Sequence, residues 1–401
     1  MLRQINYTER KAGIEMKNWK MEKWFALCVA TICGFSATAT ACNLEKDDGP
    51  IILKEIQQAK NVILLIGDGM GPNQIKAGEL YKGETLYMQQ FPYMTMVETR
   101  SASAEITDSA AAGTAMATGN RAINGQVALS SDGEELDTIM DLAQSLGKRT
   151  GVIATEEIYG ATPMTFLSHS KSRDNKDELI AGAVKSGVNF IASDIFDESY
   201  IQHFVDNGYT QITNADDISE TKAEYVIGAY RVSSSAEYGE NTERRLAFDR
   251  LITEALEYLS KDEDGFVLMA EGSHIDHGGH NNSIHYMLKE LLAFDNGVRA
   301  ALEWVKDRED TVVIVTADHE TGGLLLNEGA TGENLFDMES LDGGLTYDTK
   351  YYKWTTNSHT ATDVCCYING ANIDFSQYSF KANAKIRNTD VFEIIKNLIM
   401  I

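Results

Sequence analysis

The feature that most constrains the fold is a set of short apolar runs separated by helical patterns. The runs are apolar at consecutive positions, which is typical of strands buried on both faces of a sheet. They lie at VILLI (62–66), TGVIAT (150–155), GFVLMAEG (265–272) and TVVIVTADH (311–319). The last three each follow an amphipathic helical pattern, at 136–148, 243–260 and 286–307. The sequence therefore predicts an α/β fold with a central, mostly parallel β-sheet sandwiched between helices.

The remainder of the chain adds less regular pattern to this plan. We expect a single domain over 56–401, since a chain of 401 residues can bury one large core. A Gly- and Tyr-rich stretch at about 323–358 is predicted to be a surface excursion. The segment 190–240 is weakly patterned and is not assigned.

The first 41 residues have the pattern of a signal peptide rather than of a folded element. Lysines 17, 20 and 23 precede WFALCVATICGFSATATAC, an apolar stretch that ends in small residues. Met16 or Met21 would be the more ordinary start. We predict export, cleavage before Cys42 and lipidation of Cys42, with 42–55 as a tether. The protein would then be periplasmic or an outer-membrane-anchored bacterial lipoprotein.

The formal net charge of −25 limits the partners that the protein can have. Nucleic acid and anionic membrane surfaces are poor partners for so acidic a chain. If the substrate is itself an anion, the field must be reversed locally, and bound metal cations do this most directly.

Acidic and imidazole side chains collect where the apolar runs end. In open parallel sheets, ligands bind at the carboxyl ends of the strands. Carboxylates and neutral imidazoles are the ligand set of zinc-type ions, although any one of them alone could be a helix cap or a surface residue. We predict a metal site at this edge. Its candidate ligands are Asp68 after VILLIG, Glu271, Asp276, His277 and His280 after VLMA, and Asp318 and His319 after VVIVTA.

Asp276 and His280 are four residues apart, a spacing at which both side chains can face one ion from a helical turn or a tight loop. Gly278 and Gly279 lie between them. Because glycine disfavours helix, we predict that a loop carries this pair.

A second signal is the alanine-rich segment TDSAAAGTAMATG (107–119), which has strong helix propensity. Ser109 lies at its start, where backbone amides and the helix dipole favour a phosphoryl group. Asp108 and Ser109 could also be an ordinary helix cap. In the functional interpretation Ser109 is a nucleophile. No histidine lies nearby in the sequence, so a metal ion would ionise its hydroxyl.

A third signal is the segment ATPMTFLSHSKSR (161–173). Thr162 offers a neutral oxygen suited to a hard ion such as Mg²⁺. Arg173 could bind two phosphate oxygens, although an arginine in such a charged setting is often only a solvated residue.

Together these segments closely resemble the alkaline phosphatase family, over most of the chain after the signal peptide. The matching segments, in the family's order, are NVILLIGDGMG, TDSAAAGTAMATG, GATPMTFLSHSKSR, EGSHIDHGGH, TADHETGG and NSHTA. The resemblance implies a metal-dependent hydrolase that converts phosphate monoesters to alcohol and inorganic phosphate. It also implies a homodimer.

The resemblance assigns roles to individual residues. Ser109 would be the phosphorylated nucleophile, in contact with metal, and Arg173 would hold the phosphate. The implied cofactors are two Zn²⁺ and one Mg²⁺. The ligands would be Asp276, His280 and His359 for one zinc, Asp68, Asp318 and His319 for the other, and Asp68, Thr162 and Glu271 for magnesium. Asp108 and His277 would lie next to these ligands without binding a metal ion directly.

One position departs from the family pattern. The residue before Ala161 often carries an acidic or histidine side chain near the magnesium, and here it is Gly160. This change weakens the surroundings of the third metal site. His277 is a variant that some members of the family share.

Three other functions are considered. A Rossmann oxidoreductase is disfavoured because Pro72 replaces an expected glycine and Asp68 would repel a pyrophosphate. A phosphodiesterase or a sulfatase of the same superfamily is the main alternative, but the two adjacent cysteines do not form the C-x-P-x-R pattern of sulfatases. A non-catalytic lipoprotein that binds metal or phosphate would tolerate loss of Ser109 or Arg173, and both are present.

Overall fold

The computed structural model of the chain describes residues 58–194, 197–233, 245–335, 350–370 and 385–400. The predicted signal peptide, the Cys42 anchor and the tether at 42–55 fall outside these residues and stay predictions, as does the homodimer. None of the helices among the described residues has both the length and the apolar character needed to cross a membrane.

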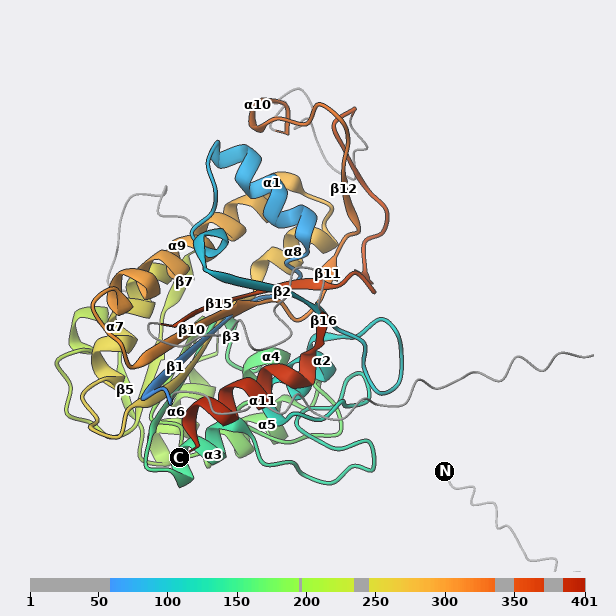
Figure 1. Cartoon of the computed structure of the whole chain (residues 1–401). Helices are drawn as coiled ribbons and strands as arrows, with labels where there is room; N and C mark the ends of the chain where they lie inside the picture. The colour runs from blue at the N-terminus through green and yellow to red at the C-terminus, as the bar shows by residue number, and fades with distance from the viewer. Residues whose placement is uncertain (1–57, 195–196, 234–244, 336–349, 371–384, 401) are drawn as a thin grey trace, which may run out of the picture. The chain divides into compact units, whose positions relative to one another are not determined.

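A ten-stranded sheet forms the centre of the described part of the chain (Figure 1). Its strand order is β16-β2-β15-β10-β1-β9-β3-β4-β6-β5, parallel from β10 to β5, with β15 antiparallel to both β10 and β2. This confirms the predicted mostly parallel sheet. The strands are β1 (Asn61–Gly67), β2 (Tyr93–Glu98), β3 (Arg149–Glu157), β4 (Phe190–Asp194), β5 (Thr210–Ile212), β6 (Val226–Ala229), β9 (Phe266–Gly272), β10 (Thr311–Thr316), β15 (Val364–Gly370) and β16 (Lys385–Arg387).

Helices cover both faces of this sheet (Figure 1). One face carries α1 (Pro72–Lys82), α7 (Phe248–Leu259), α8 (His274–His280) and α9 (Ile284–Val305). The other face carries α2 (Ser109–Thr118), α3 (Ile139–Ser145), α4 (Ala161–Met164), α5 (Lys176–Ala183) and α11 (Asn388–Ile399). Both faces of the central strands meet a helical layer, which accounts for the long apolar runs in their sequences.

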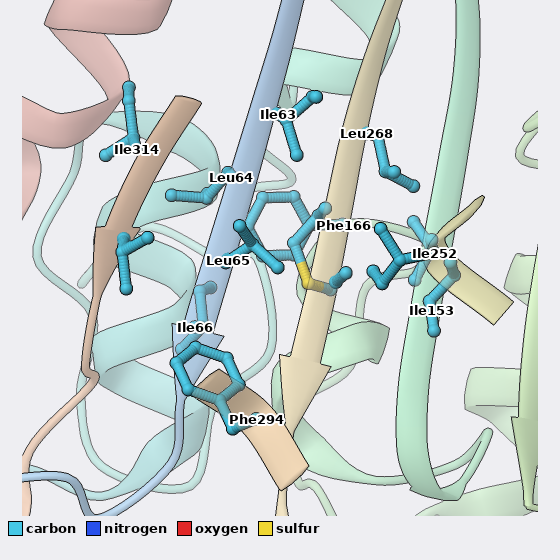
Figure 2. Close-up of a cluster of buried hydrophobic side chains, with 14 of the residues drawn as sticks. Ile63, Leu64, Leu65, Ile66, Ile153, Phe166, Ile252, Leu268, Phe294 and Ile314 are labelled. Carbon is cyan, nitrogen blue, oxygen red and sulfur yellow. The ribbon is translucent and has the colours of Figure 1, made fainter. Parts of the chain in front are cut away.

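The core lies around the central strand β1, every residue of which is buried. Figure 2 shows its side chains among residues of the neighbouring strands and of both helical layers, such as Phe166, Ile252 and Phe294. Burying one side chain of this kind contributes roughly 1.5–3 kcal/mol. The strands that carry the candidate site residues are thus held by the best-packed part of the molecule.

The predicted helices are present, with shifted ends. The pattern at 136–148 gives the shorter helix α3, because Thr138 and Asp141 form a capping box that sets its start. The pattern at 243–260 gives α7, which begins only after β8 (Arg245–Ala247), a strand paired with β7 (Arg231–Ser233). The pattern at 286–307 gives α9.

The weakly patterned segments also contain regular structure. The segment 190–240 forms β4, β5 and β6 together with α6 (Glu198–Asp206). In the excursion, β12 (Leu324–Leu326) pairs with β13 (Tyr352–Trp354), and α10 (Gly332–Leu335) lies between them in sequence. Next to it, β11 (Glu320–Thr321) pairs with β14 (His359–Thr360). This last pair brings His359 to the end of β10.

Candidate metal and phosphate site

Two groups of three potential metal ligands lie at the carboxyl edge of the central strands. In each group, one ligand atom from every residue lies within 4.8 Å of the others. One group, cluster A, comprises Asp276, His280 and His359, and the other, cluster B, comprises Asp68, Asp318 and His319. The fold therefore assembles the two residue sets that the sequence assigned to two zinc ions, although their members lie far apart in the chain.

The turn after β1 places Asp68 beside Asp318. Gly69 adopts a φ of 73°, and its N–H donates to Asp318 Oδ1 at 3.1 Å. The N–H of His319 donates to the same oxygen at 2.8 Å. Because β1 and β10 are neighbours, two strand ends share one carboxylate, and the glycine-containing turn serves to hold Asp68 in cluster B.

Asp276 and His280 lie on the short helix α8, so the predicted loop is wrong. The glycines between them allow close packing instead. A β-carbon at Gly278 would lie 2.5 Å from the backbone nitrogen of Met287, and one at Gly279 would lie 2.7 Å from the carbonyl oxygen of Thr321. Packing against α9 and β11 thus requires glycine and outweighs its low helix propensity.

The two histidines of cluster A are oriented by backbone carbonyls. His280 Nδ1 lies 2.8 Å from the carbonyl oxygen of Asn357, and His359 Nδ1 lies 2.9 Å from that of Thr107. Because a carbonyl can only accept, each Nδ1 carries a proton, and each Nε2 presents a lone pair when its ring is neutral. The two Nε2 atoms are 3.2 Å apart. Lone pairs at this distance repel unless a proton or a cation lies between them, as expected of a metal site.

Thr321 connects the two clusters, and the sequence analysis missed it. Its hydroxyl donates to Asp276 Oδ1 in cluster A. Its oxygen lies 3.2 Å from His319 Nδ1 in cluster B. The oxygen therefore accepts a hydrogen bond from the Nδ1–H group, and the lone pair of His319 Nε2 remains available to a metal ion. That Nε2 lies 3.1 Å from Asp318 Oδ2. The position of Thr321 two residues after His319, on the same side of an extended segment, was the available signal.

Glu320 is a second residue that the sequence analysis missed. Its carboxylate accepts from the side chain of Gln74 on α1 and from the hydroxyl of Thr360 on β14. It also accepts from the backbone N–H groups of Gly323 and Leu324. These contacts fix the β11–β14 pair and, through it, the position of the neighbouring His359.

Four buried oxygens at this edge have no hydrogen-bond partner among the described residues. They are Asp68 Oδ1, Thr162 Oγ1, Glu271 Oε1 and Asp318 Oδ2. The second oxygen of Glu271 is held, because Ser273 Oγ donates to it at 2.8 Å. Unpaired buried oxygens are costly unless a cation meets them. The donors therefore fit the implied ions: oxygens with imidazoles for two zinc ions, and oxygens alone from Asp68, Thr162 and Glu271 for magnesium.

The carboxyl groups of Asp68, Glu271 and Asp318 resist ionisation when no cation is bound. Burial, reinforced by the carboxylate of Asp318, raises the pKa of Asp68 well above its usual range. Burial and the carboxylate of Glu156 raise the pKa of Glu271 in the same way. Burial and Asp276 raise the pKa of Asp318 to about 6. A divalent cation would offset both the lost hydration and the repulsion between like charges.

Ser109 is the first residue of α2 and lies against cluster B. Its Oγ is 3.2 Å from His319 Nε2. A histidine distant in sequence is therefore close in space, which the sequence alone did not indicate. Every residue of α2 is buried, and its small alanine and glycine residues let the helix pack closely against α4 and α11.

Asp108 joins the start of α2 to Arg173. One oxygen caps the helix by accepting from the N–H of Ala111 at 3.0 Å. The other lies 3.3 Å from Arg173 Nη1 and accepts from the N–H of Gly125 at 3.0 Å. The Arg173 side chain is 36% exposed, so an anion at Ser109 can reach its guanidinium.

His277 lies outside both clusters. It projects from α8 with its Nε2 3.9 Å from Glu156 Oε2. Glu156, near the end of β3, is the third residue that the sequence analysis missed.

Comparisons with known proteins give one consistent family. A sequence profile described as alkaline phosphatase matches residues 59–202 and 197–391. Alkaline phosphatase 3 of Bacillus subtilis is 34% identical over 298 residues, which is 69% of this chain and 63% of that protein. Alkaline phosphatase 4 of the same organism is 31% identical over 305 residues, 71% of this chain and 66% of that protein. The chain thus spans less than two thirds of the length of these relatives.

Solved structures agree with the sequence comparisons. The alkaline phosphatase of the Antarctic bacterium TAB5 superposes with a TM-score of 0.73 at 27% identity, covering 86% of this chain and 99% of that one. A cold-active alkaline phosphatase from Shewanella gives a TM-score of 0.73 at 27% identity, covering 85% of this chain and 100% of that one.

The first prediction concerns Gly69. A β-carbon there would lie 2.6 Å from Asp276 Cα, in a backbone conformation that costs a non-glycine residue about 1 kcal/mol. We expect Gly69→Ala to displace Asp276 from cluster A and to lower both metal retention and any activity at least tenfold. Metal content after dialysis checks this.

Gly83→Ala is the matched control. Gly83 has nearly the same φ, 74°, but no atom lies within 4 Å of its β-carbon position. It should lose stability by a similar small amount and keep its metal. Equal metal loss in both variants would contradict the role given to Gly69.

The second prediction concerns pH. A hydrogen bond to Asp276 raises the pKa of His280 to about 9, and burial raises that of Glu156 to about 7. His280, Glu156 and Asp318 therefore keep their protons up to a higher pH in the folded state than in the unfolded chain. Below about pH 6.5 the buried His274 and His319 act in the opposite direction, because burial lowers the pKa of each to about 4. Stability falls as pH rises wherever the folded state binds more protons, so in EDTA the melting temperature should fall between about pH 6.5 and 9.

Added zinc and magnesium should flatten this decline, because the ions replace the protons. Thermal unfolding across the pH series, with EDTA and with metals, makes the comparison. A metal-free melting temperature that stays constant or rises over this range would show that the clustered groups are not coupled as described.

Proposed function

Because the chain belongs to the alkaline phosphatase family, we propose that it hydrolyses phosphate monoesters through a phosphoserine intermediate on Ser109. Clusters A and B would each hold a zinc ion, and Asp68, Thr162 and Glu271 would hold magnesium. One solved variant of the TAB5 enzyme is described as having Mg bound in its M3 site, which supports a third ion here.

The observation that carries the proposal is the position of the Ser109 hydroxyl. Its Oγ lies 3.2 Å from His319 Nε2, at the start of a ten-residue helix and beside two clusters of potential metal ligands. A serine that only begins a helix capped by Asp108 would need neither the clusters nor the guanidinium held by Asp108.

The proposed reaction has two steps, transfer of the phosphoryl group to Ser109 and hydrolysis of the phosphoserine. Ser109 Oγ forms a bond to phosphorus as the bond to the ester oxygen breaks, and the alcohol leaves with a proton. Water then attacks the phosphoserine, which regenerates the Ser109 hydroxyl and releases inorganic phosphate. Bound divalent ions would supply Lewis-acid stabilisation of the oxygens that gain charge.

Arg173 and the start of α2 would hold the phosphoryl group during both steps. The guanidinium can donate two N–H groups to phosphoryl oxygens, and its contact with Asp108 fixes its direction. The amides in the first turn of α2 favour the same negative charge. Burial of Ser109, which is 4% exposed, limits competing attack by bulk water.

The activity is tested with three substrates that share one leaving group: p-nitrophenyl phosphate, bis(p-nitrophenyl) phosphate and p-nitrophenyl sulfate. We expect the monoester to be hydrolysed at least tenfold faster than the others. EDTA should abolish the activity, and zinc followed by magnesium should restore it. Hydrolysis that resists EDTA, or a preference for the diester or the sulfate, would contradict the proposal.

Replacement of the nucleophile gives a second test. Ser109→Ala should lower kcat by on the order of 10³-fold or more, because no other group of the site can form the covalent intermediate. Zinc content should stay unchanged, since the ligands of both clusters remain. Ser145→Ala, at an exposed serine of α3, is the control. Substantial turnover by a zinc-loaded Ser109→Ala protein would rule out the nucleophile.

A further inference from the structure

The missing side chain at Gly160 leaves a space that the side chain of Glu156 occupies. The residue adopts φ −53° and ψ 151°, a conformation open to any amino acid, so the backbone does not require glycine. A β-carbon at this position would lie 1.9 Å from Glu156 Oε1 and 2.7 Å from Glu156 Cδ. The carboxylate of Glu156 therefore fills the volume that a side chain at position 160 would enter.

Glu156 reaches this place from the end of β3, across the turn that leads to α4. Its side chain is only 16% exposed. On the neighbouring strand β9, Glu271 pairs in register with Ala154 of β3, so Glu156 follows two residues later at the same end of the sheet. On its outer side it faces His277, whose Nε2 is 3.9 Å from Glu156 Oε2.

The neighbouring donors point to an ion in this position. Thr162 Oγ1 and Glu271 Oε1 belong to side chains that are 1% and 0% exposed, and neither atom has a hydrogen-bond partner among the described residues. A buried hydroxyl and a buried carboxylate oxygen of this kind need a cation or ordered water. The Arg173 guanidinium attracts the Glu156 carboxylate, but a further negative charge beside the other buried carboxylates adds repulsion unless a cation is bound among them.

We propose that Glu156 replaces the side chain missing at Gly160 and completes an all-oxygen Mg²⁺ site with Asp68, Thr162 and Glu271. This inference rests on the proposed function. Glu156 would act on the ion directly or across a bound water. An all-oxygen donor set favours the hard ion Mg²⁺ over zinc, which prefers imidazole or thiolate ligands. Glu156, four residues before Gly160 in the sequence, would then supply the carboxylate of the third site.

The test compares Glu156→Gln with Glu157→Gln in zinc-loaded protein. Both variants remove one negative charge from adjacent residues, but only Glu156 fills the place of the missing side chain. Magnesium binding is measured by equilibrium dialysis with elemental analysis, and as the Mg²⁺-induced rise in melting temperature. We expect Glu156→Gln to raise the Mg²⁺ dissociation constant at least tenfold and Glu157→Gln to change it less than twofold. Zinc content should stay the same in both.

A carboxylate placed at position 160 should restore the Mg²⁺ affinity that is lost when Glu156 is replaced. In the double variant Glu156→Ala with Gly160→Asp, the volume vacated by Glu156 receives the new side chain, and Mg²⁺ affinity should return toward the original value. Without metal, Glu156→Gln should melt no lower than the original protein, because one of several clustered like charges has been removed. A role in packing alone would instead lower this melting temperature and leave Mg²⁺ binding intact.

Three results would overturn the inference: unchanged Mg²⁺ affinity in Glu156→Gln, equal loss in Glu157→Gln, or no Mg²⁺ binding by the original protein. Failure of the proposed function is a separate outcome. It would appear as zinc- and magnesium-loaded protein that does not hydrolyse p-nitrophenyl phosphate, whereas the binding measurement needs no turnover.

Discussion

The repulsion between carboxylates buried at one edge of the sheet is the constraint on which the rest of the structure depends. Asp68, Glu271 and Asp318 lie close together with little access to solvent, and burial raises the pKa of each. Such groups are costly whether they are charged or neutral, because unpaired oxygens remain in either state. Bound divalent cations would remove this cost and would create a positive site within a strongly acidic protein.

The surrounding fold holds these groups in place against their repulsion. The central strands are fixed by a core that is apolar on both faces (Figure 2). Short segments then add the remaining ligands: α8 carries two of them on one helical turn, and the β11–β14 pair carries His359. Thr321 connects the clusters through one hydroxyl, so a shift in either cluster would disturb the other.

Much of this arrangement could be predicted from the sequence, because the signals are local. A run such as VILLI predicts a buried strand, and the residues just beyond its end must lie at the sheet edge, which is why Asp68 and Asp318 could be assigned. The α8 helix could not be predicted, because its glycines are required by contacts with Met287 and Thr321 that are distant in sequence. Glu156 was missed because its role depends on a space left by another residue, and no spacing rule expresses that.

The central claim is that clusters A and B each bind a zinc ion next to Ser109, and anomalous diffraction at the zinc edge tests it most directly. Crystals of zinc-loaded protein should show two strong peaks, one among Asp276, His280 and His359 and one among Asp68, Asp318 and His319. A single peak, peaks elsewhere on the molecule, or no peak in protein that hydrolyses a phosphate monoester would contradict the account.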